Sequence, residues 1–137
     1  MDHAAYPIRN GAHELAGKLE AGLAWAKRNR VALKRNQWVD RTANGRCAVC
    51  VLTAAYCAEF DKTWAEIEGE VGNCSGSELN PVEKWATSYG TVNQFHPAFI
   101  PKGIRSGDLI VDAVANLFDR GFTSTRIIKW LRGMVPA

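Results

Sequence analysis

The sequence lacks any apolar run that approaches the ~20 residues needed to span a membrane. Residues 1–10 contain no apolar segment of the kind found in secretory signals, so we expect a cytoplasmic protein with reduced thiols. Internal repeats and low-complexity tracts are also missing, and the length of 137 residues favours a single domain over 1–137. No catalytic or cofactor motif of high specificity is present, and no cofactor is expected.

One stretch is almost free of polar side chains. Residues 47–58 carry no charge and only one hydroxyl residue, Thr53, besides Tyr56. A helix that is apolar on every side is buried on every side. We therefore predict a mainly α, compact domain of five or six helices packed around a central helix at about 47–58.

The first helix is predicted from His13 to about Asn29, because apolar residues recur there at three- and four-residue steps, and residues 1–12 are expected to be irregular. Gly17 and Gly22 each weaken this helix by about 1 kcal/mol relative to alanine, or else allow close approach to the central helix. Beyond it, either the helix continues or a small β-hairpin forms near 31–39.

Later helices are predicted from their start and stop signals. Helix starts are marked by residues that can cap the free backbone N–H groups, and glycine marks the stops. The expected starts are Thr63 with Glu66, Asn80 before Pro81, Ser106 before a helix over 107–120, and Thr123 or Ser124 before a last helix that ends at Arg132.

Charge is distributed unevenly along the chain. Residues 1–46 hold nine Lys/Arg and four Asp/Glu, residues 47–90 hold two and seven, and residues 91–137 hold six and three. This basic–acidic–basic pattern indicates either a face for nucleic acid or pairing of the outer segments with the acidic middle, within one fold or across a homodimer.

The C-terminal pair of predicted helices carries the first candidate site. Leu117, Gly121, Ile127 and Trp130 occupy the positions of an inner apolar residue, a turn glycine and two apolar anchors. Residues 113–133 therefore resemble a helix-turn-helix unit, and the resemblance implies that the second helix lies in the major groove of DNA. The candidate contacts on that helix are Thr125, Arg126, Lys129 and Arg132.

A basic run near the end of the first helix is the second candidate. It can add phosphate contacts to the C-terminal helix, or it is simply a solvated helix end whose cations favour the negative pole of the helix dipole. Its members are Lys27, Arg28, Arg30, Lys34 and Arg35.

The cysteines allow two further interpretations. Cys47 and Cys50 could share a metal ion with Cys74 or His96, but burial in the central helix is favoured and no metal site is predicted. As an enzyme, the chain would resemble papain-like or transglutaminase-like proteins over a few residues, with Cys47 as nucleophile at a helix start and His96 as its base.

The remaining alternative is a protein–protein interaction module, such as an inhibitor or adaptor of the kind that phages and plasmids encode. Trp64, Trp85 and Trp130 lie on short predicted helices, where each is either an interface anchor or a core residue. We therefore predict a small non-enzymatic binding protein. Its partner is a nucleic acid or a protein, not a membrane, and nucleic-acid binding is the form that names specific residues.

Overall fold

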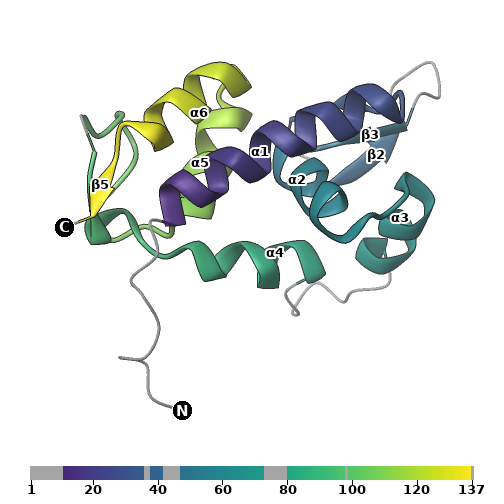
Figure 1. Cartoon of the computed structure of the whole chain (residues 1–137), viewed down its shortest axis with the longest axis horizontal. Helices are drawn as coiled ribbons and strands as arrows, with labels where there is room; N and C mark the ends of the chain where they lie inside the picture. The colour runs from purple at the N-terminus through teal and green to yellow at the C-terminus, as the bar shows by residue number, and fades with distance from the viewer. Residues whose placement is uncertain (1–10, 36–37, 42–46, 73–79, 98, 137) are drawn as a thin grey trace, which may run out of the picture.

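A computed structural model describes residues 11–35, 38–41, 47–72, 80–97 and 99–136 (Figure 1). As predicted, the described chain is mainly helical, and it forms one compact domain with a small sheet. In chain order the elements are α1 (Gly11–Arg28), β1 (Ala32–Leu33), β2 (Val39–Arg41), β3 (Cys47–Val49), α2 (Val51–Phe60), α3 (Trp64–Gly72), α4 (Pro81–Ala86), the 3-10 helices η2 (Thr87–Tyr89) and η3 (Val92–Gln94), β4 (Phe95–His96), α5 (Ile110–Asp119), α6 (Ser124–Arg132) and β5 (Val135–Pro136).

Helices α1 and α2 form the centre of the molecule (Figure 1). Every residue from Val51 to Cys57 is buried, which confirms the central apolar helix. The two helices pack over the most extensive interface between any two elements described. At their contact, a Cβ on Gly22 would lie 2.5 Å from the backbone nitrogen of Ala55. Gly22 thus allows close approach, the second of the two roles considered for it.

The central helix begins later than predicted. Cys47–Val49 is a strand, and α2 starts after Cys50, whose Sγ accepts a hydrogen bond from the backbone nitrogen of Thr53 at 3.4 Å. The strand forms because it has partners on both edges, with β1 parallel and β2 antiparallel to it. A short apolar run looks the same in a strand as in a buried helix, so composition misassigned these three residues.

The hairpin predicted near 31–39 is wrong in its pairing. Strands β1 and β2 form where they were expected, but β3 lies between them and pairs Val49 with Val39. The alternative, in which α1 continues through the basic run, is also wrong. The helix ends at Arg28, and Arg30 adopts the left-handed region with φ 56°.

Three predicted helix starts are confirmed in detail. In each, a side-chain oxygen accepts from the backbone N–H three residues later, which satisfies a donor that the first turn leaves free. Asp61, two residues before the cap at Thr63, ends α2 in the left-handed region with φ 52°. The confirmed pairs are Thr63 with Glu66, Asn80 with Glu83, and Thr123 with Arg126.

Helix α5 starts three residues after its predicted start, and Ser106 does not cap it. The residues before it are held by the preceding loop instead. The backbone nitrogen of Val92 donates to the carbonyl of Asp108 at 2.8 Å, and Ile110 donates to the carbonyl of Gly90 at 2.9 Å. These long-range hydrogen bonds hold Leu109 in an extended conformation, and Ser106 and Gly107 form a turn, where a local cap signal had predicted helix.

The chain ends in a second small sheet. Helix α6 leads into β5, which pairs antiparallel with β4 so that His96 lies opposite Val135. Figure 1 shows β5 at one end of the long axis and the β1–β3–β2 sheet near the other end. The two sheets therefore lie far apart, with α1 between them.

Candidate functional site

Helix α6 has two distinct faces. One face is buried, largely against α1, and the other is exposed and carries no acidic residue. The buried side chains are Ile127, Ile128, Trp130 and Leu131. The exposed ones are Thr125, Arg126, Lys129 and Arg132. All four residues predicted to contact nucleic acid on this helix therefore lie on its solvent face.

The connection between α5 and α6 is a tight turn around Gly121, which has φ 99°. Phe122 closes the turn by donating its backbone N–H to the carbonyl of Leu117 at 3.0 Å. Trp130, one of the two predicted anchors, is 6% exposed, and its indole N–H donates to the carbonyl of Phe99 at 2.9 Å. Gly121 thus forms the turn, and the two predicted anchors, Ile127 and Trp130, are buried.

Arginines from three segments gather at this turn. Arg126 lies 4.4 Å from the centre of the Phe122 ring, and Arg120 lies 5.7 Å from the same ring. Arg35 lies 4.9 Å from the Phe118 ring, and its Nε donates to the Phe118 carbonyl at 2.7 Å. A guanidinium stacked on a ring loses less freedom when it binds a second group. Arg120 was absent from the sequence prediction, although its place beside the turn glycine is a usable signal.

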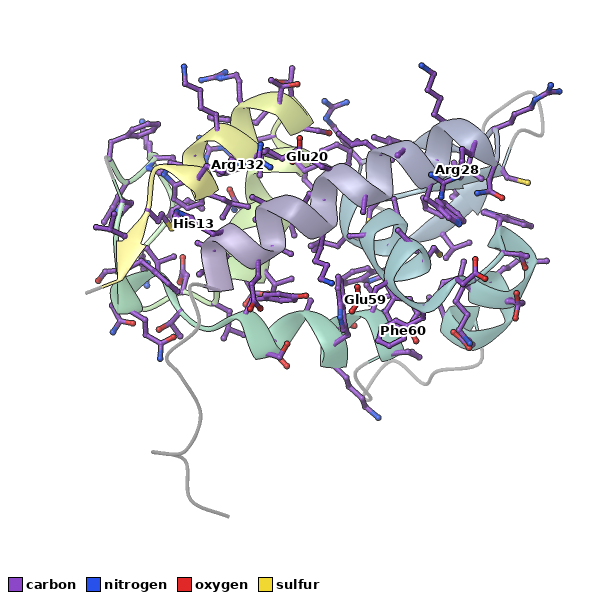
Figure 2. All side chains as sticks on the ribbon, viewed as in Figure 1. His13, Glu20, Arg28, Glu59, Phe60 and Arg132 are labelled. Carbon is purple, nitrogen blue, oxygen red and sulfur yellow. The ribbon has the colours of Figure 1, made fainter. Side chains whose placement is uncertain are left out.

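Arg132 is engaged within the fold. Its guanidinium pairs with the carboxylate of Glu20 on α1, and both side chains are half exposed. Figure 2 shows the two residues together where α6 passes the middle of α1. Arg132 therefore helps to attach α6 to α1, and its charge is already partly balanced.

The predicted basic run is divided by the fold. Arg35 reaches α5, whereas Lys34 pairs with Asp40 of β2. Lys27 and Arg28 are exposed on the last turn of α1. Arg28 lies eight positions after Glu20, the α1 residue that pairs with Arg132 of α6. This separation is about 12 Å along the helix. Arg30 is exposed just beyond the end of α1.

The cysteine and histidine of the enzyme hypothesis lie on separate sheets. Cys47 is half-buried on β3 opposite Arg41, and the backbone of His96 lies on β4 beside β5. Because these sheets lie near opposite ends of the molecule, the structure does not bring the two residues together (Figure 1).

The other described thiols are held in the protonated form. Burial raises the pKa of Cys50, although hydrogen bonds from Thr53 oppose the shift. Burial also raises the pKa of Cys57 to about 12. Both thiols lack the exposed, electropositive surroundings of a nucleophile.

Metal binding has no support in the part of the chain that the structure describes. There, no three His, Cys, Asp or Glu side chains converge on one point. Cys74 and the side chain of His96 lie outside the described part.

Among the described residues, no helix combines the length and apolarity required to cross a membrane.

No family model, no curated protein and no solved structure matches this chain.

Proposed function

We propose that this protein binds nucleic acid through the exposed face of α6. This proposal is carried by one observation: α6 buries its apolar side and presents Thr125, Arg126 and Lys129 to solvent, whereas Arg132 at its end is half exposed and paired with Glu20. Duplex DNA is the favoured partner, because its major groove admits an α-helix. The proposal includes a cytoplasmic location, where such a partner is accessible.

Each side chain has a role set by its place. Arg126 and Lys129 would contact phosphates, and Thr125, in the first turn, would face base edges. Arg35 and Arg120 flank the turn and would contact the neighbouring backbone, since their guanidinium groups are already oriented by Phe118 and Phe122. A homodimer would present two such helices to successive half-sites, which light scattering tests directly.

The test is a salt titration of binding to a fluorescent 20-base-pair duplex, followed by anisotropy. Neutralising four phosphates, with Arg126, Lys129, Arg35 and Arg120, predicts a log–log slope of about −3.6 against salt concentration. Replacing two of the cations, as Arg126→Ala with Lys129→Ala, should weaken binding at least ~10-fold and reduce the slope by about 1.8.

The matched control removes the same charge elsewhere, as Lys27→Ala with Arg28→Ala at the far end of α1. All four residues are exposed, so both double variants should fold. The control should lose less than about threefold in affinity, because screening weakens charges beyond ~10 Å. If both double variants lost the same affinity, net charge alone would explain the binding. Absence of binding at low salt would reject the proposal and leave a protein partner as the function.

A further inference from the structure

A groove of about 880 Å³ lies on a different part of the molecule, beside the first half of α1. Its walls are α1, the end of α2, and the segment from α4 to β4. Figure 2 shows Glu59 and Phe60 between α1 and α4, and His13 near the beginning of α1. The α1 residues that line it span Gly11 to Ala21, which is about 15 Å of helix. This length matches about five residues of an extended peptide.

One wall of the groove is aromatic and rigid. The ring of Trp85 meets Phe60 at 6.3 Å and Tyr89 at 5.4 Å, edge to face in both cases, and Tyr56 packs behind them. Phe60 remains 48% exposed, although it is large and apolar. Aromatic side chains that are fixed by neighbours and still reach solvent are typical anchors of binding surfaces.

The indole of Trp85 differs from the indoles of three other tryptophans. Those of Trp25, Trp64 and Trp130 each donate to a backbone carbonyl, at 2.9, 3.1 and 2.9 Å. The N–H of Trp85 donates to no atom of the residues that the structure describes, and it is not buried. Because Trp85 lines the groove, we assign its indole N–H as a donor to a bound segment beside the apolar wall, the combination that binds a peptide carbonyl and its side chain.

The charge of the groove favours a basic partner. Its lining contains the carboxylates of Glu14 and Glu59 and one ammonium, that of Lys18. Lys18 Nζ already pairs with Glu59 Oε2 at 2.5 Å, which joins α1 to α2. A positive side chain that enters the groove meets a field of opposite sign.

We propose that this groove binds a short, basic peptide segment of a partner protein. An aromatic or aliphatic side chain of the segment packs on Phe60 and Trp85, and a peptide carbonyl accepts from Trp85 Nε1. A lysine or arginine next to that anchor lies against Glu14 and Glu59. The site is separate from α6, so it stands or falls independently of nucleic-acid binding.

Gly17 provides the decisive variant. It lines the groove, and a Cβ built on it meets no atom within 4 Å. Gly17→Gln places a neutral side chain at the α1 wall of the groove while the helix is retained, because glutamine is a better helix former than glycine. Gly17→Ala is the matched control, since it changes the helix in the same way and leaves the groove open. Trp85→Phe keeps an aromatic ring at this position and removes the indole N–H that donates the hydrogen bond.

The experiment selects from a displayed library of random 12-residue peptides on the immobilised full chain, followed by anisotropy titration of the enriched peptides. We expect peptides with Lys or Arg within three positions of an aromatic or aliphatic residue. Their affinity should fall at least ~10-fold with Gly17→Gln, about fivefold with Trp85→Phe, and less than twofold with Gly17→Ala. The Arg126→Ala and Lys129→Ala pair should not change it.

Three outcomes overturn the proposal. The library yields no peptide that distinguishes the wild-type chain from Gly17→Gln, or the enriched peptides are acidic, or Gly17→Ala weakens binding as much as Gly17→Gln. The last result would mean that helix stability, not groove occupancy, controls the signal.

Discussion

The two halves of α1 use the same residue type for opposite purposes. At Gly22, the helix is so close to α2 that even a methyl group would overlap the backbone of Ala55. At Gly17, five residues earlier, the helix faces the open groove and a methyl group would touch nothing. One glycine is required by packing and the other leaves space beside a surface. The comparison shows that a glycine within a helix is explained by what lies opposite it.

The largest effect is expected in α2, the helix that packs against Gly22. It concerns the reactivity of the buried thiol of Cys57. Because burial raises its pKa to about 12, alkylation of the native protein by iodoacetamide near pH 8.5 should be slower on the order of 100-fold than in urea. Mass spectrometry of the labelled peptides measures this ratio. A native rate within tenfold of the unfolded rate would show that the α2 side is open.

The raised pKa of Cys57 also makes the free energy of unfolding depend on pH. The unfolded thiol loses its proton near pH 9, whereas the folded one keeps it until about pH 12. Between these values the folded state binds more protons, so stability falls as pH rises through this window and is fully present below it. Urea midpoints at pH 8 and pH 10.5 measure the loss, and Cys57→Ala should reduce its size.

Gly22→Ala should cause the second-largest effect. The added methyl group would lie 2.5 Å from the backbone nitrogen of Ala55, so α1 and α2 must separate. Overpacking of this kind lowers the free energy of unfolding by about 2–3 kcal/mol, more than the gain in helix propensity. Urea denaturation measures it. A stability equal to that of the wild-type chain would mean that the two helices can separate freely.

Gly17→Ala should cause the smallest effect, and one of opposite sign. The helix gains about 1 kcal/mol because alanine restricts the unfolded chain and loses no packing at this exposed position. The same denaturation experiment measures the increase. Destabilisation here would remove the contrast between the two halves of α1.

Local signals predicted much of the fold. The caps at Thr63, Asn80 and Thr123 are correct because each depends on residues no more than three positions away. The α6 face was also predictable, since helical periodicity alone separates its apolar and basic residues. These features need no knowledge of distant parts of the chain.

Features that depend on distant partners were missed or misassigned. Residues 47–49 form a strand only because 32–33 and 39–41 lie on either side of it. Arg35 lies against α5, beside the turn that leads to α6, because it contacts Phe118, which is 83 positions away. The groove is formed by three segments, and nothing in the residues near Phe60 indicates that its ring stays exposed.

The helix proposed to meet DNA is held at both ends. Thr123 caps its start, Arg132 is tied to Glu20, and the chain continues at once into β5, which is hydrogen-bonded to β4. Such a helix offers a fixed template with little freedom to adapt. A duplex that docks on it must therefore supply the adjustment by bending or by changing groove width, so sequences that deform easily should be preferred even at positions that no side chain reaches.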